Sequence, residues 1–132
     1  MEERDSHSEK ITINMSPVEL GKADLLVREG FYSNRTDFIR SAIRAQLDKH
    51  QVEVQQSIVR NAYIVGVLHY DRRILERLRE KGEHIRITVV GMLRLSKDVP
   101  AELAAEVIAS IRVHGVFQAS EAVKAALAER MI

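Results

Sequence analysis

Hydrophobic and polar residues alternate strictly from Lys10 to Ser16. Ile11, Ile13 and Met15 are apolar, and the residues between them are polar. A period of two is typical of a strand with one buried face and one face in water. The residues that follow have helical spacing, so this predicted strand has no partner nearby, although its backbone amides and carbonyls need one.

A first helix is predicted to begin at Pro17 and to end at Gly30. Ser16 can cap it, Pro17 suits the first helical position, and Glu19 completes a capping box. Gly30 can take the left-handed conformation that ends helices. The apolar residues of this segment have the spacing of one buried helical face: Val18, Leu20, Ala23, Leu26 and Val27.

A second helix is predicted after the connector Phe31 and Tyr32, with Ser33 as its cap. Its buried face is predicted at Phe38, Ile39, Ala42, Ile43 and Leu47. No glycine or proline follows before Gly66, so we expect this helix to continue past Leu47 through Val52, Val54 and Ile58.

An isolated strand can find its partner in a second copy of the chain, paired antiparallel across a two-fold axis. The order of strand, capped helix, glycine, connector and capped helix resembles the ribbon-helix-helix DNA-binding proteins of the Arc, MetJ and CopG type. The segment "FYSNRTDFIRSAIRAQL" (31–47) is close to the second-helix pattern of that family. The resemblance covers roughly residues 9–50 and implies an intertwined β-α-α dimer.

The resemblance also implies that a two-stranded ribbon enters the major groove of DNA with its polar face. On this reading Lys10, Thr12 and Asn14 contact bases. Lysine can donate to guanine, asparagine can make a two-point contact with adenine, and threonine can hydrogen-bond or touch a thymine methyl. The alternative is that this polar face is simply solvated.

The start of the second helix suits a DNA phosphate, because it offers free amides and the positive end of the helix dipole. Ser33, Asn34 and Arg35 are therefore the predicted phosphate contacts, although Ser33 could serve only as a cap. Arg40 and Arg44 lie one turn apart on the polar face. We interpret them first as ion-paired or solvated residues, with backbone contact as the alternative.

Residues 61–132 contain an internal repeat. "ITVVGMLRLSKDVPAEL" (87–103) and "IRVHGVFQASEAVKAAL" (111–127) are identical at seven of seventeen positions. A more diverged copy (62–78) aligns Gly66 with Gly91 and Gly115. Each copy predicts a strand running through its glycine and then a helix. The expected helix caps are Asp71, Ser96 and Ser120.

Three strand-helix units favour parallel strands joined by helical crossovers. Three glycines in register indicate that the strands lie side by side at that point. The expected fold class is α+β, with a ribbon-helix-helix followed by a small α/β module of three β-α repeats. The predicted divisions are a tail (1–8), a DNA-binding domain (9–50), a helical extension or linker (51–60) and the repeat module (61–132).

Composition adds little to this picture. The chain is 45% hydrophobic and 30% charged, as in a soluble globular protein, and no apolar run approaches membrane-spanning length. The first residues are acidic and polar and there is no cysteine, so we expect a cytoplasmic protein. A net charge of +1 gives no hint of nucleic-acid binding, which must depend on where the charges lie.

The length, the N-terminal pattern and "VGVLHYDRR" (65–73) also resemble the nickel-responsive repressors, distantly. That family holds nickel through a His-x-His pair, a further histidine and a cysteine. Here there is no cysteine, and the histidines lack that spacing: His7, His50, His69, His84 and His114. We therefore expect no metal site and no cofactor.

No catalytic motif is present, so we expect no enzymatic activity. Asp71 with Glu76, and Glu102 with Glu106, are better explained as helix caps or exposed charges.

The sequence therefore predicts a homodimeric, sequence-specific transcriptional regulator, a repressor. Its C-terminal module is expected to assemble tetramers or larger oligomers, or to bind a partner or an effector. The alternative is an antitoxin whose C-terminal module binds its toxin. The apolar composition of that half favours a folded module over a tail that folds on binding.

Overall fold

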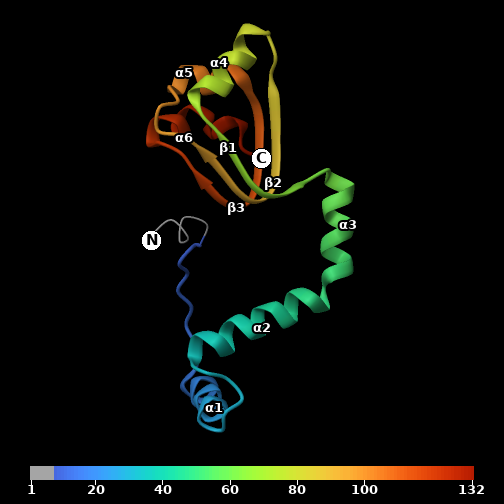
Figure 1. Cartoon of the computed structure of the whole chain (residues 1–132), viewed down its shortest axis with the longest axis vertical. Coiled ribbons are helices and arrows are strands. Elements are labelled where there is room, and N and C mark those ends of the chain that lie inside the picture. Colours follow the sequence, from blue (N-terminus) through green and yellow to red (C-terminus); the bar gives the residue numbers. More distant parts are fainter. Residues whose placement is uncertain (1–7) are drawn as a thin grey trace. The chain divides into compact units, whose positions relative to one another are not determined.

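The computed structural model describes residues 8–132 (Figure 1). The chain forms two compact units, one up to Ser57 and one from Ile58 to Ile132. Within the described residues the first unit is helical, and the second combines helices with a parallel sheet. None of the helices between residues 8 and 132 has the length and hydrophobicity needed to cross a bilayer.

Helix α1 (Pro17–Arg28) begins and ends where the sequence predicts. The Ser16 hydroxyl accepts from the Glu19 amide at 3.1 Å and donates to the Glu19 carboxylate at 3.2 Å. Gly30 follows the helix with φ +91°, and the Phe31 amide returns to the Leu26 carbonyl at 3.0 Å. This left-handed glycine turns the chain out of the helix while its last carbonyls remain hydrogen-bonded.

Helix α2 (Arg35–Lys49) is capped by Asn34, and the prediction of Ser33 as the cap is wrong. The Asp37 amide donates to Asn34 Oδ1 at 2.8 Å, and the Ser33 amide donates to Asp37 Oδ2 at 2.9 Å. The Asn34 side chain thus accepts from the backbone near Asp37, and the Asp37 side chain accepts from the backbone near Asn34, as in a capping box. Asparagine caps as well as serine does, so the sequence did not separate the two adjacent candidates.

The predicted long second helix is interrupted at His50, and α3 (Gln51–Asn61) is a separate element. The His50 amide bonds to the carbonyls of Gln46 and Leu47, which tightens the last turn of α2. His50 then leaves helical geometry with φ −106° and ψ 22°. The break occurs without glycine or proline, so neither of the residues that usually indicate the end of a helix was there to predict it.

The segment Lys10 to Ser16 is not assigned as a strand, so the N-terminal β-α-α arrangement is not confirmed. A strand is defined by backbone hydrogen bonds to a neighbouring strand. The only backbone bond of this segment to the described part of its own chain is the first bond of α1, in which the Leu20 amide donates to the Ser16 carbonyl at 3.0 Å.

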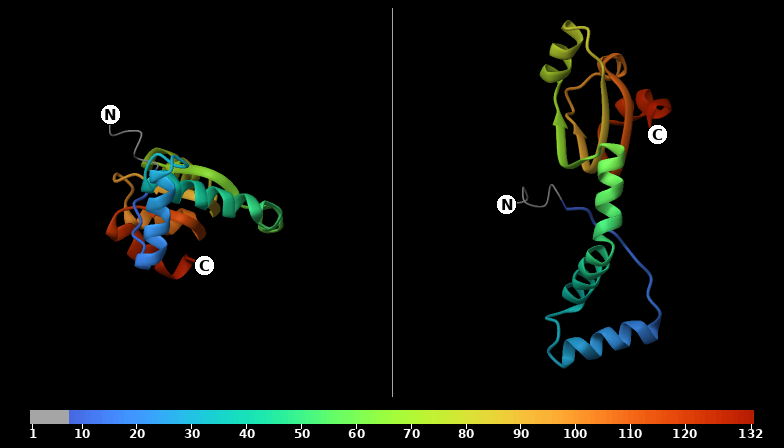
Figure 2. Two further views of the ribbon diagram at one scale, coloured as in Figure 1. Left: turned by 90° about the horizontal axis from the view of Figure 1, so that it is seen from below. Right: turned by 90° about the vertical axis from the view of Figure 1, so that its right-hand side faces the viewer.

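The second unit alternates strands and helices, as the repeat predicts (Figure 1). Its elements in chain order are β1 (Ile64–Tyr70), α4 (Arg72–Glu80), β2 (Ile85–Leu95), α5 (Ala101–Val107), β3 (Ile108–Gln118), α6 (Glu121–Leu127) and the 3₁₀ turn η2 (Ala128–Arg130). The three strands are parallel and lie in the order β1-β2-β3. The helices cover one face of the sheet, and the strands lie side by side when viewed from the other face (Figure 2, right).

The core of this unit lies between the sheet and its helices. Leu75 of α4, Leu103 of α5 and Leu127 of α6 are buried there against the inward residues of the strands. The remaining members of the core are Ile87, Val89, Leu93, Leu95, Val99, Ala104, Val107, Ile108, Ile111 and Val123. All members of this cluster belong to the second unit, and their burial stabilises it through the hydrophobic effect.

The three repeat glycines form a column across the sheet. Gly66 pairs with Gly91, and Gly91 pairs with Gly115. A Cβ on Gly91 would lie 2.1 Å from the Gly66 oxygen, and one on Gly115 would lie 1.9 Å from the Gly91 oxygen. No larger residue fits at either position, which explains the glycine at each repeat.

Asp71 and Ser120 cap α4 and α6 as predicted, but Ser96 does not cap α5. The extended residue Pro100 precedes that helix. Ser96 instead donates its amide to the Tyr70 carbonyl at 3.0 Å, and its hydroxyl lies 2.7 Å from His69 Nε2. The loop between β2 and α5 is thereby held to the end of β1.

Candidate nucleic-acid interface

Both faces of the Lys10 to Ser16 segment are open to solvent. The predicted base contacts Lys10, Thr12 and Asn14 are exposed. On the alternate, apolar face Ile11 and Ile13 are exposed too, with Ile11 at 70%, and Met15 is half-buried. The alternation that predicted one buried face is present, but the described part of this chain does not cover that face.

A wide apolar groove of about 1090 Å³ lies between this segment and helices α1 and α2. Its apolar lining residues are Ile11, Ile13, Met15, Ala23, Leu26, Phe38, Ile39, Ala42 and Ile43. Ala23 is the only fully buried side chain among residues 8–57, and α2 contains none. The helices of the first unit therefore have apolar faces but no closed core between them.

The three predicted phosphate contacts come together at the start of α2, and each already has a partner within the chain. The Ser33 amide and the Asn34 side chain are bonded to Asp37. Arg35 donates from two nitrogens to both carboxylate oxygens of Asp24, each at 2.8 Å. These hydrogen bonds hold the pKa of Asp24 below its usual value and raise the pKa of Arg35.

Sequence reasoning missed Asp24, because it lies eleven residues from Arg35 and on the other helix. Opposite charges are common in both helices, and no local pattern shows which of them will meet. The pair joins α1 to the first turn of α2.

The free positive charge at this end of α2 belongs to two other arginines. Arg40 and Arg44 line a small hollow of about 270 Å³ together with Ser33, Asn34, Thr36 and Asp37. Neither arginine forms an ion pair with any described residue. The i,i+4 spacing had already placed both on one polar face.

The first turn of α2 also has free backbone donors, and one of these residues, Thr36, lines the hollow. The amides of Arg35 and Thr36 precede the first intrahelical bond of α2, and within residues 8–132 they have no acceptor. Two free amides, two guanidinium groups and a helix dipole make this end of α2 attractive to an anion, while the Asp37 carboxylate opposes it.

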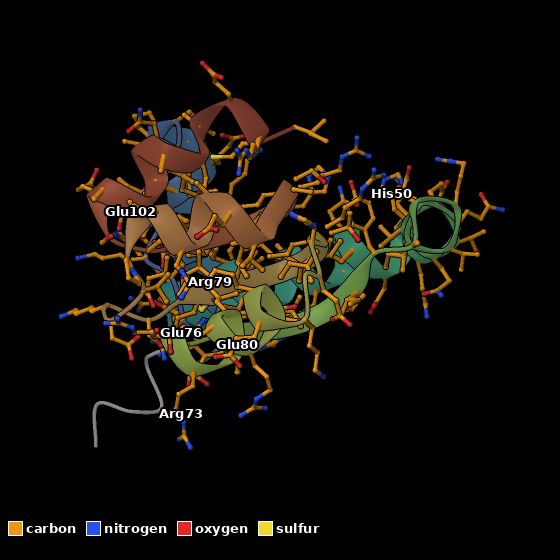
Figure 3. The ribbon with its side chains drawn as sticks, turned by 90° about the horizontal axis from the view of Figure 1, so that it is seen from above. His50, Arg73, Glu76, Arg79, Glu80 and Glu102 are labelled. Atoms are coloured by element: carbon orange, nitrogen blue, oxygen red, sulfur yellow. The ribbon has the colours of Figure 1, made fainter. Side chains whose placement is uncertain are left out.

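Charged side chains of the second unit form ion pairs on its helices, and Figure 3 labels one member of each pair, Glu76 and Arg79. Arg72 bonds to Glu76 at 2.9 Å within α4, and Arg79 reaches Glu106 of α5 at 3.2 Å. The Asp71 carboxylate accepts from the Ile74 amide at 2.9 Å as a helix cap. The carboxylates of Asp71, Glu76 and Glu106 are therefore each bonded to a group of the protein itself.

The histidines of the sheet are hydrogen-bonded to hydroxyl groups. His69 lies against Ser96, and His114 Nε2 lies 2.7 Å from the Tyr63 hydroxyl. In the part of the chain that the structure describes, no three histidine or acidic side chains are grouped as ligands for a metal ion. His7 lies outside the described residues.

Comparison with known families finds a match over most of the chain. A model of the Ribbon-Helix-Helix transcriptional regulator family matches residues 6–124, which include most of both units. Comparisons with curated proteins and with solved structures find no match. Because the family match extends over most of the 132 residues, this chain belongs to the ribbon-helix-helix family of transcriptional regulators.

Proposed function

We propose that this protein is a homodimeric, sequence-specific DNA-binding repressor that acts in the cytoplasm by binding rather than by catalysis. The observation that carries the proposal is the open apolar groove of the first unit. Two helices with apolar faces and one fully buried side chain among residues 8–57 cannot form a stable core. A second copy that lays its own apolar faces into the groove supplies the missing core.

The pattern of Lys10 to Ser16 supports the way in which the two copies meet. Antiparallel pairing of two such segments satisfies their backbone groups and turns Ile11, Ile13 and Met15 toward the helices. The polar face with Lys10 and Asn14 then points outward. A ribbon of two strands fits the DNA major groove, where lysine and asparagine distinguish base pairs.

The start of α2 supports a contact with the DNA backbone. The predicted contacts Ser33, Asn34 and Arg35 surround the first turn, whose free amides can bind a phosphate. Arg40 and Arg44 add the unpaired positive charge. Such contacts position a protein on the duplex without reading its sequence.

The test is selection of bound DNA from a random pool by the full-length protein, followed by titration of the selected site. We expect an inverted repeat, because a two-fold dimer presents two identical ribbons. Affinity for the selected site should fall steeply with salt as condensed counterions are released. Recovery of asymmetric sites alone, or an affinity independent of salt, would contradict the proposal.

A further inference from the structure

One end of the sheet in the second unit is an apolar edge strand. Within residues 8–132, β1 pairs only with β2, so its other edge is free. Five of its seven residues are exposed, among them Ile64 at 52%, Val65 at 63% and Val67 at 46%. Natural proteins protect free edges with lysine, proline or a bulge, and β1 has none of these. Such an edge is suited to accept another strand.

The glycine column gives this edge a particular shape. At Gly91 and Gly115 the space of the absent Cβ is filled by the carbonyl oxygen of the preceding strand. Gly66 has the same backbone geometry, with φ +136°, but no atom lies within 4 Å of its Cβ position. The free edge of β1 therefore has the same backbone shape as the edge of β2 that pairs with β1 and the edge of β3 that pairs with β2.

The opposite end of the sheet is partly covered by the chain itself. Met131 forms a parallel bridge with Ile111, and the Ile132 amide donates to the Ile111 carbonyl at 2.8 Å. These residues take the first positions of a further strand beside β3. No described strand lies beside residues 113–118 of β3 on that side. In the right-hand view of Figure 2, β1 and the C-terminal residues lie at opposite edges of the sheet.

The register of the sheet predicts what would fit beside this part of β3. β1 pairs with β2 through residues 64–70 and 89–95, and β2 pairs with β3 so that Gly91 meets Gly115. Suppose that β1 of another chain is added beside β3 in the same register. Its Gly66 would then lie beside Gly115. Ile64 would then lie beside Val113, and Leu68 beside Phe117. These three pairs are apolar or glycine, while the same register sets Val65 beside His114 and His69 beside Gln118. The strand would begin just past Ile132.

We propose that the second unit stacks end to end with that of another copy, β1 of one chain pairing in parallel with β3 of the next. Gly66 receives the Gly115 carbonyl in its open Cβ position. Repeat units of this kind bury their faces against neighbouring repeats, and an uncapped end is completed by further stacking. The contact is head to tail, so it joins copies into larger assemblies. This contact uses β1 and β3 and none of the residues predicted to contact DNA.

Charges on the helix layer fit the same contact. Figure 3 shows α4, α5 and α6 stacked in that order, with Arg73 directed away from α5 at the free side of α4. Arg73 is the second residue after the cap Asp71, and Glu121 is the first after the cap Ser120. Both are exposed, and neither forms an ion pair with a described residue. Stacking brings these opposite charges to similar heights on adjoining helices.

Cross-linking of the full chain tests the pairing, since the protein has no cysteine of its own. Val67→Cys chains and Val116→Cys chains are purified, mixed and mildly oxidised, then separated on a non-reducing gel. Parallel stacking sets these two positions directly opposite, within disulfide reach, so a mixed cross-linked dimer is expected. Each variant alone should remain unlinked. Cross-linking of Val67→Cys alone would indicate β1 paired with β1 and would overturn the proposal, as would no mixed product.

A charge-reversal experiment tests the helix contact by the mass of the assembly in sedimentation. Arg73→Glu and Glu121→Arg should each weaken association about two- to fivefold, and the double variant should restore it. Glu102→Arg on the central helix α5 is the matched control and should have no effect. Equal association of all variants, or a double variant no better than the singles, would contradict stacking through these helices.

Discussion

Arg35 and Asp24 form a two-point ion pair, with both hydrogen bonds at 2.8 Å, between the first turn of α2 and the middle of α1. Both side chains are about half exposed, so water and anions can reach them. The pair fixes the angle at which the two helices meet. It also occupies one of the residues predicted to contact DNA, so a phosphate at this point must share Arg35 with Asp24.

The Asp24 pair predicts a dependence of stability on pH. Asp24→Asn should lower the free energy of unfolding at pH 7, because it removes the charge that Arg35 binds. The pKa of Asp24 is lowered in the folded protein, so its contribution is full above about pH 4, its unfolded pKa. That contribution is lost as the pH falls through the folded value.

Denaturant unfolding between pH 7 and about pH 3 measures this effect, and the difference between wild type and Asp24→Asn should shrink as the pH falls. Asp48→Asn on α2 is the control, because Asp48 has no ion pair within the described residues. A difference that is constant over the whole pH range would show that the carboxylate charge is not what matters.

The unpaired arginines of α2 predict a uniform effect on DNA affinity. Arg40→Ala or Arg44→Ala should weaken binding to all sequences alike and reduce the salt slope by about one, as expected for a lost phosphate contact. Titration of the selected site and of random DNA at several salt concentrations measures both quantities. Arg86→Ala on β2 serves as the control. A change at the selected site alone would instead assign these arginines to base recognition.

The polar face of the N-terminal segment predicts the opposite behaviour. Replacing Lys10, Thr12 or Asn14 by alanine should relax discrimination at particular base pairs by about 1–3 kcal/mol for a good two-point contact. Binding to single-base variants of the selected site measures this discrimination. If affinity for specific and random DNA falls by the same factor, these residues do not read bases.

The glycine column predicts an order of stabilities. In the unassembled chain, Gly66→Ala should cost about 1–3 kcal/mol, since only the strain of a positive φ opposes the methyl group there. Gly91→Ala should cost more, because its Cβ would also meet the Gly66 carbonyl at 2.1 Å. Chemical denaturation of the two variants gives the comparison. Equal losses would mean that the sheet adjusts to admit the side chain.

The observed cap of α2 predicts a difference between neighbouring residues. Asn34→Ala should destabilise the protein by about 1 kcal/mol, because the Asp37 amide loses its acceptor. Ser33→Ala should have little effect, since Ser33 contributes its backbone amide and not its hydroxyl. Thermal unfolding of both variants distinguishes them, and the reverse order would restore Ser33 as the cap.

Local patterns predicted the local structure well. The start and end of α1 follow from Ser16, Pro17 and Gly30, because capping involves groups within a few residues of each other. The parallel pairing of β1, β2 and β3 follows from the repeat, since a helix between two strands returns the chain to the end of the sheet where the previous strand began. The break at His50 and the cap at Asn34 were not predicted, because adjacent residues have almost equal propensities there.

By itself, the sequence determined the spacing of apolar residues, most of the helix caps and the repeat with a glycine in each strand. All of these depend on neighbours along the chain. Only the tertiary structure decided that Arg35 meets Asp24, that Ser96 bonds to His69, and that Gly66 has an open edge where Gly91 has a carbonyl. These relationships join residues far apart in sequence. Their distances are set by the packing of whole elements, which no local pattern records.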